Sequence, residues 1–288
     1  MFTIANTKQW LEEPFQPISL AELDVKAAKL ERLDNKYVVR ANALAEALPA
    51  LMDRFDILEI EGQRRFVYDT CYFDDEERRS FFDHHQGRRQ RIKVRVRHYR
   101  GTDLCFVEVK LKDKRGATVK KRLPYTLDQY GVLDEHALSY IEQCHQELYQ
   151  RNFARQLQPS LSMSYRRVTL VAREGSERMT IDSDFCFQHE LQQCTLPPDI
   201  FILETKSSNG HGISDRILRQ FHQHPSNRCS KYCMGLIMTR QVTLYNNFRS
   251  TLRKLNLPEA GRIASHPMPL ILPTSPAIIY NDLEGVAW

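Results

Sequence analysis

The sequence predicts an α+β protein, built on an antiparallel sheet that closes into a barrel with helices on its flanks. About eight segments alternate polar and apolar residues with the two-residue period of a strand. Turn signals join most of these segments as hairpins, which favours antiparallel pairing and closure into a barrel. The composition is globular, because 42% of the 288 residues are hydrophobic and 27% are charged.

Residues 1–27 are expected to form a leader with one short helix. Pro14 and Pro17 interrupt this stretch, and Ser19 followed three residues later by Glu22 has the pattern of a helix-capping box. The main domain is expected over 28–240. The elements predicted in its first half are a strand over 29–40, a helix over 42–53, short strands near 55–61 and 65–73, and a polar helix over 75–85.

Three long strands are predicted next, over 90–100, 104–112 and 117–126, because apolar residues alternate and glycine-containing turns separate the segments. Apolar residues with helical spacing then predict a helix over 134–149. The elements expected after it are strands over 161–172, 178–187 and 200–207 and helices over 213–222 and 231–239. A proline-rich tail over 241–288 is expected to be irregular over its last forty residues.

Several classes of protein are disfavoured by the composition. No apolar run approaches the ~20 residues of a membrane-spanning helix, and the N-terminus lacks the basic-then-apolar pattern of a signal peptide. Seven cysteines, an odd number, are scattered along the chain as expected of free thiols in a reducing compartment. These features together predict a cytoplasmic protein.

Positive charge is concentrated in one part of the chain. The formal net charge is only +5, yet residues 88–122 contain fourteen Lys or Arg against three acids, a local net charge of +11. A segment this basic in an almost neutral protein suggests a polyanionic partner. Composition alone leaves nucleic acid, nucleotide, phosphate chains and acidic lipid as candidates.

The spacing of these cations places them on one face of the sheet, because side chains two apart on a strand share a face. Arg91, Lys93, Arg95 and Arg97 are spaced in this way, and mixed acidic and basic pairs recur on several later strands. The face could be solvated or could line a closed barrel. The recurrence favours the barrel interior, where so many cations would require a bound polyanion.

The order of these motifs resembles the VTC domain, the polyphosphate-polymerase branch of the triphosphate tunnel metalloenzymes, over about residues 28–240. The motifs are Arg32-x-Asp34-x-Lys36-Tyr37, Tyr68-Asp69-Thr70-x-Tyr72-Phe73-Asp74, Lys93-Val94-Arg95-Val96-Arg97-x-Tyr99, Val107-Glu108-Val109-Lys110, Ser164-Tyr165-Arg166-Arg167, Arg178-x-Thr180-x-Asp182, Leu203-Glu204-x-Lys206 and Ser230-Lys231-Tyr232. The resemblance implies a tunnel of eight antiparallel strands. It also implies transfer of the γ-phosphate of ATP to a polyphosphate chain, with Mn²⁺ or Mg²⁺ as cofactor.

The resemblance also assigns roles to individual residues. The implied catalytic residues are Lys36, Arg95, Arg97, Lys110, Arg167 and Lys231. The implied phosphate-binding residues are Arg32, Lys93, Lys121, Arg122, Arg178 and Lys206. The metal is implied to bind Glu204 and Glu108. Arg and Lys suit phosphoryl transfer, which needs alignment and charge neutralisation more than covalent chemistry from the protein.

One departure from the superfamily affects the predicted reaction. Hydrolytic members carry Glu-x-Glu-x-Lys on the first strand, whereas this sequence has Arg32 and Asp34 at the two acidic positions. The loss of a carboxylate favours transfer over hydrolysis. A triphosphatase and a non-catalytic polyphosphate-binding module remain alternatives. Nucleic acid is not expected as a partner, because the basic faces lack the exposed aromatic residues that stack on bases.

Overall fold

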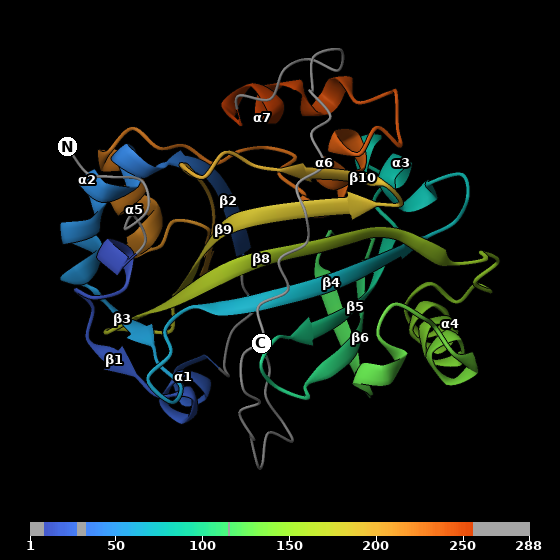
Figure 1. Cartoon of the computed structure of the whole chain (residues 1–288), viewed down its shortest axis with the longest axis horizontal. Helices are drawn as coiled ribbons and strands as arrows, with labels where there is room; N and C mark the ends of the chain where they lie inside the picture. The colour runs from blue at the N-terminus through green and yellow to red at the C-terminus, as the bar shows by residue number, and fades with distance from the viewer. Residues whose placement is uncertain (1–8, 28–32, 115, 256–288) are drawn as a thin grey trace.

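The computed structural model describes residues 9–27, 33–114 and 116–255 (Figure 1). Most predicted elements are present with ends shifted by a few residues. The strands are β1 Pro17–Ile18, β2 Leu33–Arg40, β3 Phe55–Leu58, β4 Phe66–Asp74, β5 Arg91–Tyr99, β6 Cys105–Lys112, β7 Thr118–Tyr125, β8 Gln158–Ala172, β9 Arg178–His189, β10 Gln192–Thr195 and β11 Ile200–Ser207. The helices are α1 Leu20–Ala27, α2 Ala41–Met52, α3 Arg79–His85, α4 Glu135–Tyr149, α5 Ile213–Gln220, α6 Lys231–Met238 and α7 Arg249–Lys254.

The strands form one sheet whose main path runs β2-β11-β9-β8-β4-β5-β6-β7, with every neighbouring pair on this path antiparallel. The prediction of an α+β fold with an antiparallel sheet is therefore confirmed. The predicted closure into a barrel is loose, because β2 and β7 are the ends of the path and do not pair within the described residues. The loop before α6 occupies the backbone of β2 instead, where the Ser226 N–H donates to the Lys36 carbonyl at 2.6 Å.

The outer face of the sheet is apolar and is covered by helices. Leu44 and Leu51 of α2 and Leu218 of α5 pack with Tyr37 and Leu203 of the sheet in one buried cluster. At the other end, α4 covers β5 and β6 in a second cluster. Figure 1 shows α2 and α5 beside one end of the sheet and α4 beside the other. The apolar half of each alternating strand thus supplies the core that holds these helices.

The opposite face, called here the inner face, is apolar in one region only. There α6 packs against β8 and β9, and Gly235 permits the close approach, because a Cβ at this position would collide with the side chain of Leu161 and lie 2.8 Å from Cδ1 of Phe187. The buried Tyr232 hydroxyl donates to Asp74 at 2.5 Å and anchors the start of α6 to β4. The rest of the inner face carries the charged side chains.

The chain segments that flank the domain differ in how well the sequence predicted them. The capping box is present, because the Glu22 carboxylate accepts from the Ser19 backbone N–H at 2.9 Å and the Glu22 N–H donates to the Ser19 hydroxyl at 3.3 Å. The irregular tail was expected from about residue 249, but α7 begins there. Phe248 and Leu252 are buried in the cluster that includes α6, which explains why this segment is ordered into a helix. Residues 256–288 lie outside the described part.

No helix within the described residues combines the length and the apolar character needed to cross a membrane.

Candidate active site

Cross-strand register places two rows of charged side chains on the inner face of β5, β6 and β7. Lys93 pairs with Lys110, and Lys110 pairs with Lys120. In the adjacent row, Arg95 pairs with Glu108, which pairs in turn with Arg122. Directly opposed residues in an antiparallel pair point to the same face, so all these side chains project into the same space.

The inner face of β2, β9 and β11 carries a matching set. Lys36 pairs with Glu204, and Asp34 pairs with Lys206. Lys206 is opposite Arg178 on β9. Alternation along the strands then carries this face to Asp182 on β9 and to its cross-strand partner on β8, Arg167.

Curvature of the sheet brings these two sets together. Lys110 of β6 interacts electrostatically with Glu204 and Lys36, although β11 and β2 are far from β6 in the strand order. The Lys110 side chain is reached by solvent yet is surrounded by protein. Burial lowers its pKa to about 8, an effect that the attraction of Glu204 only partly offsets. The inner face therefore encloses a water-accessible cationic space.

Glu108 organises one group of cations. Its carboxylate is 1% exposed and accepts from Nε of Arg95 at 2.6 Å, with Nη1 of Arg97 at 3.8 Å and Lys120 forming a third ion pair. Burial opposes its ionisation, but Arg95, Arg97 and Lys120 outweigh that effect and hold the pKa of Glu108 well below its usual value. Glu108 was predicted as a metal ligand. Enclosed by three cations, it is better placed to orient guanidinium groups than to bind a metal.

The two arginines of this group are further fixed by tyrosines. Nη2 of Arg97 donates to the Tyr165 hydroxyl at 3.0 Å, and Nη1 of Arg95 donates to the Tyr72 hydroxyl at 3.1 Å. Arg97 is 4% exposed. Each guanidinium is therefore preorganised, which lowers the entropy cost of binding a phosphate oxygen.

Asp182 organises a second group. Nε and Nη2 of Arg167 donate to its two oxygens at 2.6 and 2.8 Å, and Nζ of Lys231 lies 2.7 Å from Oδ2. Burial disfavours the charged carboxylate, but Arg167 and Lys231 still lower the pKa of Asp182. Because Lys231 is the first residue of α6, this ion pair ties the helix to the cationic face. Asp182 was not predicted as a site residue, although it shares a strand face with Arg178.

Glu204 organises a third group, which is the best candidate for a metal site. It forms ion pairs with Lys36 at 2.9 Å and with Lys206 at 2.6 Å, and Lys206 also contacts Asp34 at 2.9 Å. Burial opposes ionisation of Glu204, but Lys36, Lys206 and Lys110 keep its pKa well below the usual value. The hydroxyl of Thr180, opposite Glu204 on β9, is buried without a hydrogen-bond partner.

These residues fit a divalent ion bound together with substrate. Asp34 and Glu204 both contact the same Lys206 nitrogen, so an ion at that position would reach two carboxylates. Mg²⁺ typically takes one or two carboxylates and completes its coordination with phosphate oxygens and water. Within the residues described, no group of three or more His, Cys, Asp or Glu side chains could hold a metal without such help.

Most of the predicted site residues meet on the inner face. The residues brought together are Lys36, Lys93, Arg95, Arg97, Lys110, Arg122, Arg167, Arg178, Lys206, Lys231, Glu108 and Glu204. Lys121 does not join them, because it points to the outer face and pairs with Glu147 of α4. Its neighbour Lys120 takes the inward position, which the alternation of β7 could have indicated. Arg32 lies outside the described residues.

Comparison with known proteins identifies the family. No protein with a curated function matches the sequence. The family model of the VTC domain matches residues 31–239, which is more than half of the chain. The chain belongs to the VTC domain family.

The solved structures similar to this VTC domain are distant in sequence. A candidate adenylate cyclase from Bacillus halodurans is 11% identical, with a TM-score of 0.45 over 70% of this chain and 95% of that one. A candidate adenylyl cyclase from Hippeastrum, reported to have a dominant triphosphatase activity, is 10% identical, with a TM-score of 0.44 over 75% and 99%. The RNA triphosphatase of S. pombe is 16% identical, with a TM-score of 0.25 over 76% of each chain.

The chemistry available to this VTC domain is charge neutralisation. Cations on the inner face outnumber the carboxylates Asp34, Glu108, Asp182 and Glu204, and each of these four accepts an ion pair. A carboxylate held in this way is a poor general base. A chain of phosphates, by contrast, could be bound along its length by fixed guanidinium groups and mobile ammonium groups.

Proposed function

We propose that this VTC domain is an ATP-dependent polyphosphate polymerase. In this reaction the terminal oxygen of a polyphosphate chain attacks the γ-phosphorus of ATP. The bond between that phosphorus and the β–γ bridging oxygen breaks, ADP leaves, and the chain grows by one unit. Membership of the VTC domain family and the surplus of preorganised cations on the inner face support the proposal.

The observation that carries the proposal is the arrangement of the cations around three buried or half-buried carboxylates. Phosphoryl transfer between two polyphosphorylated partners brings many negative charges close together, and the main catalytic demand is to align and neutralise them. Arg95, Arg97 and Arg167 offer planar donors held by Glu108, Asp182 and two tyrosines. Lys36, Lys110 and Lys206 offer mobile charges.

The carboxylate pair Asp34 and Glu204 would hold Mn²⁺ or Mg²⁺ in this proposal. Bound there, the ion would neutralise charge on the phosphate oxygens. Lys206, which bridges the two carboxylates, would then be released to contact phosphate. Lys36 would stay beside Glu204 and orient the same phosphate group.

A triphosphatase is the second candidate, because Asp34 and Glu204 could position a water molecule as well as an ion. The engagement of every inner-face carboxylate by a cation argues against it, since activation of water requires a free base. A non-catalytic polyphosphate-binding module would use the same cations without turnover.

One incubation separates the three functions. The protein is mixed with ATP, Mn²⁺ and a short polyphosphate primer, and the products are resolved by chain length on a gel. A ladder that grows with time, with ADP released in step, is the expected result. Orthophosphate without a ladder would identify a triphosphatase. Binding of tripolyphosphate without either product would identify a binding module.

A further inference from the structure

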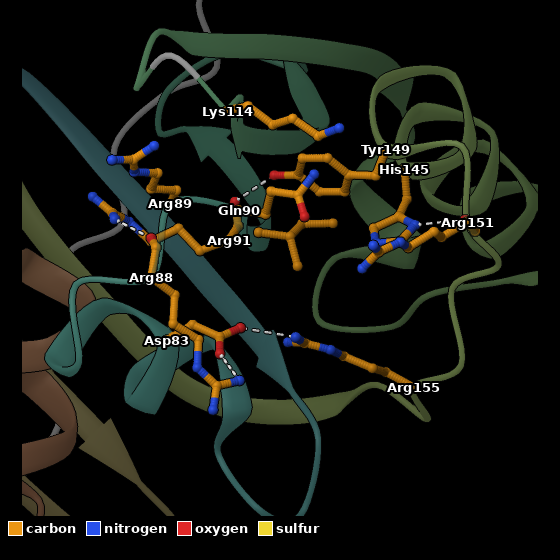
Figure 2. A pocket seen from close by; sticks show the side chains of 11 residues that line it. Asp83, Arg88, Arg89, Gln90, Arg91, Lys114, His145, Tyr149, Arg151 and Arg155 are labelled. Atoms are coloured by element: carbon orange, nitrogen blue, oxygen red, sulfur yellow. Dashed lines mark hydrogen bonds and ion pairs between the residues drawn. The ribbon is translucent and has the colours of Figure 1, made fainter.

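A second cationic site lies outside the inner face. A cavity of about 570 Å³ opens where the α3–β5 loop, the β6–β7 hairpin and the end of α4 meet. Six Lys or Arg side chains line it, against one carboxylate, Asp83 (Figure 2). The cations are Arg88, Arg89, Arg91, Lys114, Arg151 and Arg155. We call this cavity the outer pocket.

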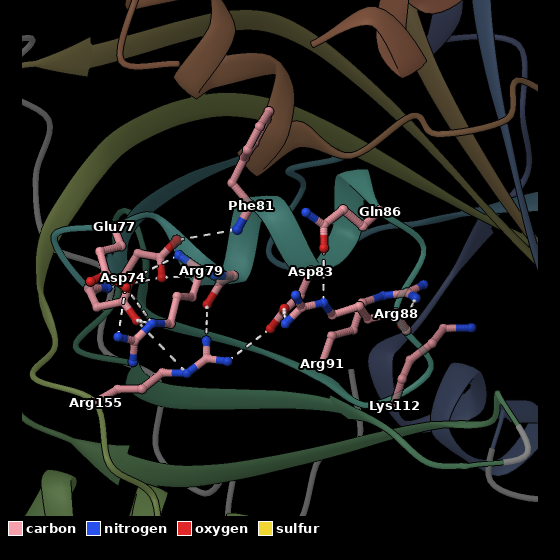
Figure 3. Close-up of polar contacts among 12 residues, drawn as sticks. Asp74, Glu77, Arg79, Phe81, Asp83, Gln86, Arg88, Arg91, Lys112 and Arg155 are labelled. Carbon is pink, nitrogen blue, oxygen red and sulfur yellow. Dashed lines mark hydrogen bonds and ion pairs between the residues drawn. The ribbon is translucent and has the colours of Figure 1, made fainter. Parts of the chain in front are cut away.

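Buried polar contacts fix one wall of the outer pocket. Asp83, which is 3% exposed, accepts from Nη1 of Arg88 at 3.0 Å and from Nη2 of Arg155 at 2.8 Å (Figure 3). Nη1 of Arg91 donates to the Arg88 carbonyl at 2.6 Å. The single carboxylate of the pocket is therefore already neutralised by two arginines, and these arginines are held in place.

The other cations of the pocket have no counter-ion. Arg89, Lys114 and Arg151 are exposed, and across 9–27, 33–114 and 116–255 no carboxylate forms an ion pair with any of them. Like charges gathered around a cavity repel one another unless an anion is bound. The surplus of charge thus points to an anionic ligand with several charges.

The aromatic residues of the pocket favour phosphate groups over nucleic-acid bases as that ligand. The Tyr149 hydroxyl is tied to the backbone of β5 and β6, donating within reach of the Arg91 and Lys112 carbonyls at 3.0 and 2.7 Å. The His145 ring packs edge-on against Tyr149 with centroids 4.8 Å apart and also contacts Phe153. Neither ring offers the open face on which a base would stack.

The outer pocket is continuous with the inner face through β5. Arg91 lines the pocket and shares a strand face with Lys93, two residues further along, a separation of about 7 Å. Nζ of Lys93 in turn donates to the Ser230 hydroxyl at 2.8 Å, beside Lys231. A linear anion could therefore pass from one site to the other without leaving a cationic surface.

We propose that the outer pocket binds a segment of a linear polyphosphate chain whose end occupies the inner face. The pocket holds consecutive phosphate groups through Arg89, Lys114 and Arg151, while Arg88 and Arg155 form its fixed wall. The choice of a phosphate chain as ligand rests on the proposed function. The site gives long chains an advantage over tripolyphosphate, which is too short to reach both surfaces.

The test compares binding of long polyphosphate, several tens of units in length, with binding of tripolyphosphate. The pocket variant is Arg89→Ala/Arg151→Ala. A matched control, Arg216→Ala/Arg219→Ala, removes two exposed arginines from α5, which Figure 1 shows at the opposite end of the sheet from α4. A third protein, Lys36→Ala/Lys110→Ala, weakens the inner face and leaves the outer pocket intact.

The pocket variant should bind long polyphosphate at least about tenfold more weakly, since two charge-assisted phosphate contacts are lost. Its affinity for tripolyphosphate should not change, and the control should behave as wild type. The dependence of log Kd on log salt should also become shallower by about one to two contacts. The inner-face variant should lose tripolyphosphate binding and retain weak binding of long chains.

Other results overturn the inference and separate it from the proposed function. Unchanged long-chain affinity in the pocket variant, or equal loss of long-chain and tripolyphosphate affinity, would exclude a separate chain-binding site. Single-stranded DNA of equal charge that displaces long polyphosphate equally well would show a non-specific basic surface. Failure of the proposed function would appear instead as absence of chain growth in the wild type, with pocket-dependent binding preserved.

Discussion

Replacing Lys110 by arginine should extend phosphate binding to higher pH. Lys110 projects into the enclosed inner face, where burial lowers its pKa to about 8, with attraction from Glu204 and repulsion from Lys36 as the next largest effects. Arginine stays charged at every accessible pH. The Lys110 side chain is reached by solvent, so the larger guanidinium has space. The variant therefore changes the titration and keeps the positive charge.

The expected magnitude follows from linkage. Bound phosphate raises the pKa of Lys110, so binding below about pH 8 involves an ammonium group that is already protonated. Above that pH each binding event must take up a proton, and the affinity falls by up to about tenfold per pH unit. From about pH 7 to about pH 9 the protonated fraction falls from about nine tenths to about one tenth. The Kd of wild type should therefore rise about tenfold more than that of the variant.

Calorimetric titration with tripolyphosphate in two buffers of different ionisation enthalpy measures both the affinity and the protons taken up. The arginine variant reports the titration of the ligand itself, which is subtracted from the wild-type curve. An identical pH dependence in the two proteins would refute the reasoning, because the titrating group would then not be Lys110.

Three further outcomes are expected. Glu204→Gln should abolish metal-dependent product formation with the fold retained by circular dichroism, and excess chelator should stop wild-type turnover; activity that persists in either case would contradict the metal role. Arg97→Ala should lower kcat/KM by about 10²-fold or more, because a preorganised guanidinium beside Tyr165 is lost; near-normal turnover would remove Arg97 from the phosphate site. Gly235→Ala should lower the free energy of unfolding by about 1–3 kcal/mol, since the added methyl collides with Leu161; unchanged urea denaturation would show that α6 can shift.

The sequence predicted the charged face well because it depends on local alternation. Arg91, Lys93, Arg95 and Arg97 lie on one strand, and the two-residue period determines their common face whatever the rest of the fold does. Membership of the VTC domain family was likewise predicted from the order of the motifs. These signals are local or ordered along the chain, so they survive without knowledge of tertiary contacts.

Other features depend on contacts that a sequence pattern does not contain. Whether the sheet closes depends on what occupies the edge of β2, and that is settled by the loop around Ser226. The helical tail segment depends on a distant apolar surface that receives Phe248 and Leu252. Lys121 was chosen from its place in a motif, whereas the pleat of β7 turns Lys120 inward. The motif gave the approximate position and the pleat decided the residue.

The three carboxylates Glu108, Asp182 and Glu204 act as resident counter-ions for the inner face. A phosphate ligand entering this space must displace these internal partners, so binding is an exchange of anions around fixed cations. The cations are never bare, which lets the domain fold before any ligand arrives. Release of solution counter-ions is correspondingly small on the inner face. Salt should therefore weaken binding there less than the number of cations alone would imply.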